Sequence, residues 1–195
     1  MQHSKPKVFF IGFNKTATTA FHKLFLDSGY KSYHHKKNKK KYLAKIIHEN
    51  YLNNDPILKT IDDADCYSDL VYSTHDEYIE ANSFYKEIFR EYPSSYYVLQ
   101  TRNIDNWICS RLKHIGTESF AYRVCNVLDI TERELIDYWK NLYSSRVSEI
   151  INFYKNKSNF IIFDIDNDEI TKLTQFLSVD FSLELSYWKK HNVSK

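Results

Sequence analysis

The segment Val8–His22, with the sequence VFFIGFNKTATTAFH, constrains the fold of this chain more than any other segment. Four apolar residues from Val8 to Ile11 predict a buried strand. Gly12 and a short polar stretch predict a tight turn, and the amphipathic pattern that follows predicts a helix. Because a helix N-terminus presents unpaired N–H groups and a positive dipole end, this arrangement is typical of phosphate-binding sites.

The polar stretch places Lys15 ahead of three threonine hydroxyls. It differs from the Walker A loop, G-x-x-x-x-G-K-[ST], because its lysine precedes the hydroxyls and its second glycine is missing. A lysine and three hydroxyls at a helix N-terminus still indicate a phosphate-bearing ligand. The alternative is an ordinary strand-to-helix turn in which threonines cap the helix.

Strong apolar runs alternate with helical patterns along most of the 195 residues. The expected strands are Lys7–Gly12, Lys31–His34, Asp65–Asp69, Tyr96–Thr101 and Phe160–Phe163. The expected helices are Thr18–Ser28, Tyr42–Tyr51, Asp76–Tyr92, Ile104–His114, Glu118–Leu128, Glu132–Lys155 and Asp168–Leu177. Thr131 with Glu134 predicts a capping box at the start of the helix Glu132–Lys155. This alternation predicts one α/β domain, residues 1–195: a P-loop-like three-layer sandwich whose central parallel sheet of about four to five strands is flanked by helices.

Composition limits the classes of function. A net charge of +2 is too small to indicate nucleic-acid binding. The polar N-terminus has no signal-peptide pattern, and no apolar run approaches a membrane span, so we expect a cytoplasmic protein. The three cysteines do not have zinc-site spacing, and we expect no metal.

A second group of polar residues follows the strand Tyr96–Thr101. Arg102 comes directly after this strand, and Ser110 lies two turns into the next helix. Ligands of parallel sheets bind at the carboxyl ends of the strands, which places Arg102 beside the Lys15 turn. An arginine fork and a hydroxyl that converge there can hold a phosphate dianion.

Both segments resemble motifs of sulfotransferases. The order Lys-Thr-Ala-Thr-Thr from Lys15 resembles their 5′-phosphosulfate loop, [KR]-x-G-[ST]-[ST]. The spacing of Arg102 and Ser110 resembles their 3′-phosphate motif, R-[DN]-P-x-[DE]-x-x-x-S, with Ile104 in place of proline. The segments FYKEIFREYPSSYYVLQTR, FIIFDI and KLTQFL are also similar to family stretches, so the resemblance extends over Val8–Leu177, and its closest form is the small bacterial or viral type.

The resemblance implies a sulfuryl donor, 3′-phosphoadenosine-5′-phosphosulfate, and an acceptor with a hydroxyl or amine, without a metal. By position, Lys15 contacts the 5′-phosphosulfate, the threonines donate to the 5′-phosphate, and Arg102 and Ser110 hold the 3′-phosphate. Ala17 replaces a glycine that allows positive φ and close approach, so we expect reduced donor affinity. The implied donor-binding set is Asn14, Lys15, Thr16, Ala17, Thr18, Thr19, Arg102 and Ser110.

A general base must accept the acceptor's proton. His34 is the first candidate because it ends a strand at the same sheet edge as Lys15, and Asp69 is the second. Single histidines are often structural, and this alternative applies to His22, His35 and His75 as well. Trp107 and Trp139 fit core anchors better than adenine stackers, whereas Arg111 and Lys113 either add to the 3′-phosphate field or are ordinary helix-face charges.

The acceptor cannot be named from the residues. A glycan, a small aromatic alcohol, a lipid and a peptide tyrosine all stay open, and so does the oligomeric state. We expect the lysine run Lys36–Lys41 to form a loop or the start of a helix. Two interpretations stay open: the run recruits an acidic acceptor or the anionic donor, or it is a solvated loop without such a role. Two further functions compete with sulfuryl transfer: a small-molecule or nucleotide kinase, and a nucleotide-binding module without turnover.

Overall fold

A sheet with a parallel centre forms the middle layer of the molecule. The computed structural model describes residues 5–113 and 119–189. Its seven-stranded sheet has the order β4-β3-β2-β5-β1-β8-β9, and the five strands from β2 to β9 in this order are parallel. These five are β1 (Val8–Phe10), β2 (Ser32–His34), β5 (Cys66–Ser68), β8 (Tyr96–Thr101) and β9 (Phe160–Asp164). The predicted α/β sandwich is confirmed.

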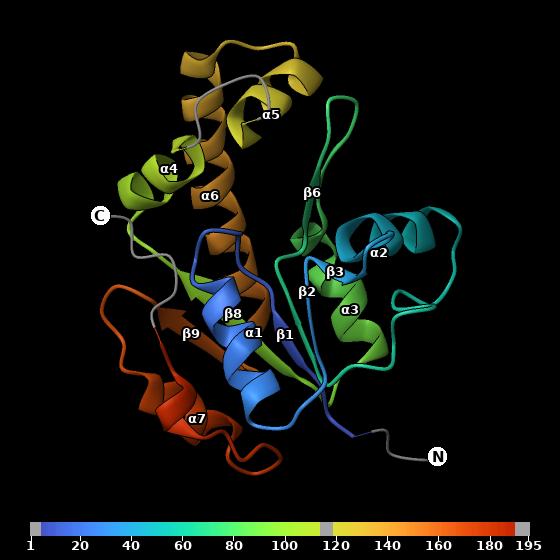
Figure 1. Cartoon of the computed structure of the whole chain (residues 1–195), viewed down its shortest axis with the longest axis vertical. Coiled ribbons are helices and arrows are strands. Elements are labelled where there is room, and N and C mark those ends of the chain that lie inside the picture. Colours follow the sequence, from blue (N-terminus) through green and yellow to red (C-terminus); the bar gives the residue numbers. More distant parts are fainter. Residues whose placement is uncertain (1–4, 114–118, 190–195) are drawn as a thin grey trace.

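Helices cover both faces of the sheet (Figure 1). Val8 and Phe10 of β1 face one helix layer, and Phe9 and Ile11 face the other, because successive side chains of a strand point to opposite faces. All four side chains are fully buried. The first layer is α1 (Thr18–Asp27) and α7 (Ile170–Leu177), and the second is α2 (Leu43–Leu52), α3 (Tyr85–Glu91) and part of α6 (Glu132–Tyr154).

A third apolar cluster lies beyond the carboxyl ends of the strands. It joins α4 (Ile104–Leu112), α5 (Phe120–Leu128) and the first part of α6. Trp107 and Trp139 are fully buried in it, which confirms them as core anchors. The predicted capping box at the start of α6 is also confirmed.

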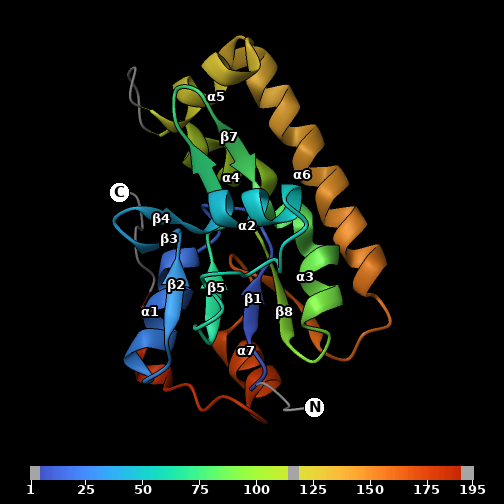
Figure 2. The same cartoon turned by 90° about the vertical axis from the view of Figure 1, so that its right-hand side faces the viewer.

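The predicted helix Asp76–Tyr92 is wrong over its first half. β6 (Val71–Ser73) and β7 (Tyr78–Glu80) form an antiparallel hairpin, which Figure 2 shows beside α5. A 3-10 turn (Ala81–Phe84) and the short α3 follow. Thr74 Oγ1 accepts the backbone N–H groups of the next turn residues, Asp76 and Glu77. This side-chain turn allows the chain to reverse without glycine or proline.

The lysine run also folds as a hairpin rather than as a loop or helix start. β3 (Lys36–Asn38) and β4 (Lys41–Tyr42) pair antiparallel at the edge of the main sheet. Asn38 Oδ1 accepts the backbone N–H groups of Lys40 and Lys41, which closes the turn. The expected ends of two helices, His114 and Glu118, lie outside the described residues.

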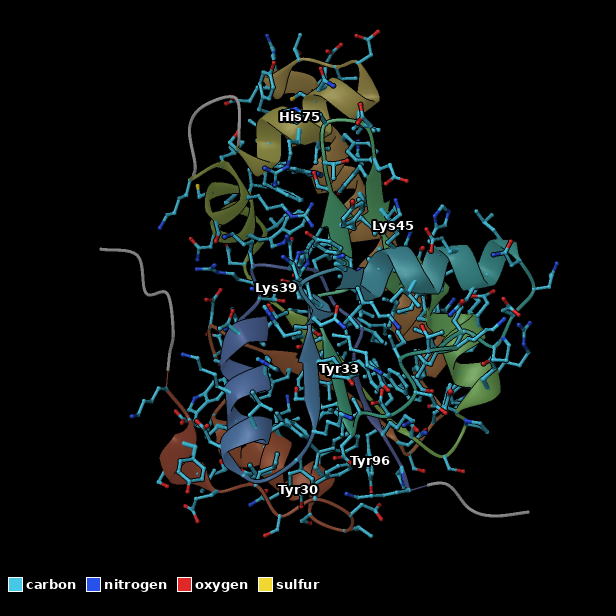
Figure 3. All side chains as sticks on the ribbon, turned by 45° about the vertical axis from the view of Figure 1, so that its right-hand side comes forward. Tyr30, Tyr33, Lys39, Lys45, His75 and Tyr96 are labelled. Atoms are coloured by element: carbon cyan, nitrogen blue, oxygen red, sulfur yellow. The ribbon has the colours of Figure 1, made fainter. Side chains whose placement is uncertain are left out.

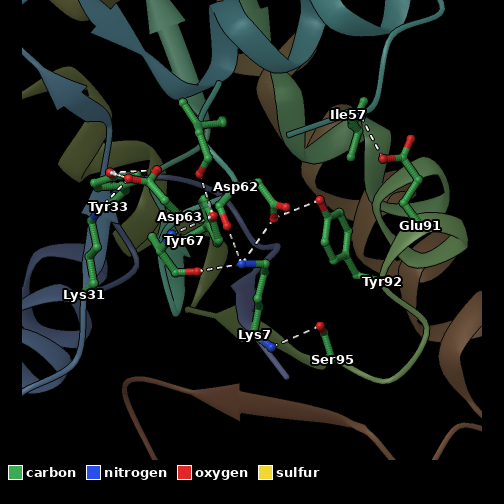
Figure 4. Close-up of polar contacts among 12 residues, drawn as sticks. Lys7, Lys31, Tyr33, Ile57, Asp62, Asp63, Tyr67, Glu91, Tyr92 and Ser95 are labelled. Carbon is green, nitrogen blue, oxygen red and sulfur yellow. Dashed lines mark hydrogen bonds and ion pairs between the residues drawn. The ribbon is translucent and has the colours of Figure 1, made fainter. Parts of the chain in front are cut away.

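Structural contacts close the opposite, amino end of the sheet (Figure 4). Lys7 Nζ donates to the carbonyls of Asp62 and Ala64, at 2.6 and 2.9 Å. Tyr92 donates to the Asp62 carboxylate at 2.9 Å. These bonds hold the segment before β5 against the amino ends of the strands. The polar side chains of the candidate site gather at the opposite edge, where the strands have their carboxyl ends.

Candidate functional site

The loop after β1 is held against β8 by a close backbone approach. A Cβ at Gly12 would lie 2.3 Å from the carbonyl oxygen of Gln100, so only glycine fits there. The Gly12 N–H donates to Gln100 Oε1 at 2.9 Å. The lysine-bearing loop therefore begins at a point that is fixed relative to β8.

Two residues of this loop have left-handed backbone conformations. Lys15 has φ of 64° and Ala17 has φ of 60°, a region that favours glycine. Ala17 is also the N-cap of α1, and no side chain caps that helix. The alternative of a threonine-capped turn is therefore not what forms. The Ala20 N–H donates to the Ala17 carbonyl at 2.9 Å, whereas the Thr18 and Thr19 N–H groups have no acceptor among the described residues and can bind an anion.

The three threonines of the loop differ in their contacts. The Thr16 hydroxyl is fully buried and donates to the carbonyl of Phe13, so its proton is already engaged. Thr18 Oγ1 lies 3.2 Å from His34 Nε2. Thr19 is half-buried, and its hydroxyl has no partner in residues 5–113 and 119–189. Only Thr18 and Thr19 can turn a hydroxyl proton toward a ligand without breaking a bond to the backbone.

The loop after β1 and the end of β8 meet at Lys15 and Arg102. Arg102 Nη1 donates to the Lys15 carbonyl at 3.3 Å. Lys15 Nζ is half-buried and makes no hydrogen bond or ion pair with any described residue. Burial lowers the pKa of Lys15, and the charge of Asp69 opposes this effect. The guanidinium that follows β8 is therefore in contact with the backbone of the lysine in the loop after β1.

Arg102 is fixed through its backbone while its side chain is only partly engaged. Tyr143 Oη accepts the Arg102 N–H at 2.9 Å and donates to the Arg102 carbonyl at 2.8 Å. Arg102 Nε lies 3.7 Å from an Asp166 oxygen and has no hydrogen-bond acceptor in the described chain. Ser110 is half-buried on α4, with a hydroxyl that bonds to no described residue. This corner therefore retains free donors.

His34 and Asp69 form a buried pair beside Thr18. His34 Nε2 lies 3.4 Å from Asp69 Oδ2, and Asp69 Oδ1 is buried without a hydrogen-bond partner in the described residues. Burial lowers the pKa of His34 to about 3 and raises the pKa of Asp69 to about 7. Between about pH 3 and pH 7 the contact thus joins two largely uncharged groups rather than an ion pair.

The other histidines have structural contacts. His22 stacks on His34, with ring centroids 5.3 Å apart, and its Nδ1 bonds to Ser32 Oγ at 2.8 Å. His35 Nδ1 donates to the carbonyl of Val71 at 3.0 Å. His75 lies in the turn of the β6–β7 hairpin, far along the molecule from Tyr33 of β2 in Figure 3.

Arg111 is the residue of this site whose environment the sequence did not predict. It is fully buried rather than part of a solvent-facing phosphate field. Its Nη2 donates to Glu80 Oε1 at 2.6 Å, and its Nε donates to Asn14 Oδ1 at 2.9 Å. Its guanidinium lies 4.2 Å from the Trp107 ring centroid. The apolar spacing of Trp107, Ile108 and Arg111 along α4 was the signal that could have located it.

The Arg111 contacts position the loop after β1. Asn14, just before Lys15, is held through its side chain by Arg111 and through its carbonyl by Trp107 Nε1 at 2.9 Å. Glu80 connects this cluster to the β6–β7 hairpin. One buried ion pair thus links α4, the hairpin and the loop after β1.

The comparisons with known proteins agree with this architecture. Residues 7–180 match the sequence profile of a sulfotransferase domain, and the chain belongs to this family. A crystal structure of a sulfotransferase from Alicyclobacillus acidocaldarius has a similar fold, with a TM-score of 0.52 and 14% sequence identity. The alignment covers 97% of this chain and 87% of that chain. A search of curated proteins found no significant match.

Residues 5–113 and 119–189 contain neither a candidate membrane-spanning helix nor a candidate metal-binding cluster. No described helix combines the length and apolar character that a bilayer crossing requires. No group of three or more His, Cys, Asp or Glu side chains in residues 5–113 and 119–189 has a metal-binding arrangement.

Proposed function

We propose that this chain transfers a sulfuryl group from 3′-phosphoadenosine-5′-phosphosulfate to an acceptor hydroxyl or amine. The observation that carries the proposal is the meeting of Lys15 and Arg102, two cations from different strands, at one edge of the sheet. Each retains an N–H group without an acceptor in the described chain. Two separate cations suit two separate phosphates, as in a 3′,5′-bisphosphorylated nucleotide, better than one triphosphate.

The residues have distinct roles in this proposal. Lys15 and the uncapped N-terminus of α1 bind the 5′ side of the donor and stabilise the negative charge that develops on the leaving phosphate oxygen. Arg102 and Ser110 hold the 3′-phosphate. The bound donor supplies the sulfuryl group, whose sulfur leaves that oxygen and bonds to the acceptor oxygen or nitrogen. Arg111 positions the loop through Asn14 without contacting the donor.

Asp69 replaces His34 as the preferred general base. A pKa of about 7 matches neutral pH, whereas a pKa of about 3 makes His34 a weak proton acceptor. Asp69 Oδ1 is also unpartnered among the described residues, so no described donor competes for the proton-accepting carboxylate there. His34 then orients the carboxylate through Oδ2.

Thermal unfolding with adenosine 3′,5′-bisphosphate, compared with ATP and Mg²⁺, tests the donor site. We expect the bisphosphate to raise the melting temperature because it binds only the folded protein. Lys15→Ala should weaken bisphosphate binding about tenfold or more, since it removes a charge-assisted contact. Lys23→Ala, on the exposed side of α1, is the matched control.

Three outcomes would contradict the proposal. Stabilisation by ATP and Mg²⁺ alone would favour a kinase. Equal effects of the two lysine variants would remove Lys15 from the site. Bisphosphate binding by a protein that releases no bisphosphate from the donor with any hydroxyl or amine would favour a binding module without turnover.

A further inference from the structure

A pocket of about 420 Å³ opens beside the His34–Asp69 pair. Asn14 lies at the donor-loop side of this pocket, and both members of the pair line it. The remaining lining comes from β3, β4, the β6–β7 hairpin and α5. A ligand in the pocket would thus lie next to both the proposed base and the donor loop.

One wall of the pocket is aromatic. The rings of Tyr42 and Tyr72 meet edge to face, with centroids 4.7 Å apart. Neither phenol hydroxyl has a hydrogen-bond partner in the part of the chain that the structure describes. The wall therefore offers flat apolar faces to a ring and two free hydroxyls to its polar substituents.

The same wall carries positive charge. Lys36 Nζ lies 4.6 Å from the Tyr42 ring centroid and makes no ion pair with a described carboxylate. Arg123 lines the pocket from α5. Lys45, labelled in Figure 3 on α2, lies 5.4 Å from the Tyr72 ring, but Glu77 neutralises it at 2.6 Å. An anionic group near Lys36 would therefore gain a charge partner that the protein does not supply.

The buried end of the pocket has an unsatisfied acceptor. The Asp69 side chain is mostly buried, and its Oδ1 has no hydrogen bond in the described residues. A buried carboxylate oxygen without a donor is unfavourable, and a ligand hydroxyl would satisfy it. The pocket thus presents, in order, a hydrogen-bond acceptor, an aromatic wall and a cation.

We propose that this pocket binds acceptor alcohols built on a ring that also carries an anionic group. The hydroxyl donates to Asp69, the ring lies against Tyr42 and Tyr72, and the anion faces Lys36. The proposal rests on the sulfuryl transfer proposed above and names its acceptor class. During transfer the acceptor's O–H proton passes to the Asp69 carboxylate, and the acceptor oxygen forms the new bond to sulfur as the bond to the phosphate oxygen breaks. A phenolic acid and a uronic acid share this chemistry.

Calorimetric titration of matched ligand pairs tests the acceptor class and distinguishes its two sources. The first pair is 4-hydroxyphenylacetate and 4-hydroxyphenylacetamide, and the second is the methyl glycosides of glucuronic acid and glucose. All are titrated into the full chain saturated with adenosine 3′,5′-bisphosphate. In at least one pair the anion should bind about tenfold tighter than its neutral partner, the range of one charge-assisted hydrogen bond.

Two lysine variants of the same hairpin provide the control. Lys36→Gln should remove most of the anion's advantage because it removes the pocket-wall cation. Lys39→Gln should leave it unchanged, since Lys39 is exposed in the hairpin turn and does not line the pocket. Equal losses in both variants would reduce the effect to long-range charge and overturn the proposal.

Two other results would overturn the acceptor class. One is equal or tighter binding of the neutral partner in both pairs, and the other is no measurable binding of either anion. Titration with the bisphosphate alone separates these failures from failure of the proposed function. If the bisphosphate binds and Lys15→Ala weakens it, the donor site stands and only the acceptor class is rejected. If the bisphosphate does not bind, the sulfuryl-transfer proposal fails.

Discussion

The His34–Asp69 pair should give the protein two opposing pH dependences of stability. Burial raises the pKa of Asp69 from 3.8 to about 7, so the folded protein holds a proton that the unfolded chain releases. Asp69 therefore makes folding less favourable as pH rises from about 4 to about 7. Burial lowers the pKa of His34 from 6.5 to about 3, so His34 makes folding less favourable as pH falls through that window.

The magnitudes follow from these pKa values. Each pH unit between folded and unfolded pKa corresponds to about 1.4 kcal/mol. Asp69 spans about 3 pH units, so its largest contribution is about 4 kcal/mol. His34 spans about 3.5 pH units, so its largest contribution is about 5 kcal/mol. The two slopes overlap between about pH 4 and pH 6.5, where they oppose each other and largely cancel in the wild-type protein.

Single substitutions should reveal each slope. As the pH increases from about 4 to about 7, the free energy of unfolding of Asp69→Asn should rise relative to that of the wild type, because the penalty of ionising Asp69 is gone. As the pH increases from about 3 to about 6.5, the free energy of unfolding of His34→Gln should fall relative to that of the wild type. Asparagine tolerates the left-handed backbone of Asp69, whose φ is 56°. The measurement is urea unfolding followed by tryptophan fluorescence at constant ionic strength.

The double variant is the internal control for this experiment. With both groups removed, its difference from wild type should vary little between pH 4 and pH 6.5. The reasoning would be refuted by single-variant difference curves that are flat to within about 0.5 kcal/mol, well below the expected range. Slopes of the same sign in both variants would refute it equally.

Two further experiments test the loop and its support. Arg111→Met and Glu80→Gln should each lower the free energy of unfolding by about 3–5 kcal/mol, because each leaves a buried charge unpaired. In urea unfolding, the double variant should lose clearly less free energy of unfolding than the sum of the two single losses. Additive losses would show that the two charges do not interact. Ala17→Gly should raise stability by about 0.5–1 kcal/mol because its φ is 60°. Ala20→Gly, inside α1, should lower it by about 1 kcal/mol or more, and a loss in both variants would argue against backbone strain at Ala17.

The sequence predicted the elements whose patterns are local. The apolar run of β1, the glycine that follows it and the amphipathic pattern of α1 lie within twenty consecutive residues, and the structure forms them in that order. The same is true of β8 and of the Thr131–Glu134 capping box. Both hairpins were missed because Asn38 and Thr74 form their turns through side-chain bonds rather than through glycine or proline.

The tertiary structure alone decided which polar residues are buried and with whom. Arg111 and Asn14 are 97 residues apart in the chain, and nothing in the local pattern of either pairs them. The His34–Asp69 contact likewise joins the ends of two strands that only the sheet order brings together. Local periodicity specifies where a strand ends and which phosphate-binding residues follow it. The choice of base and the shape of the acceptor pocket depend on burial, because burial sets the pKa values and is produced by contacts between distant segments.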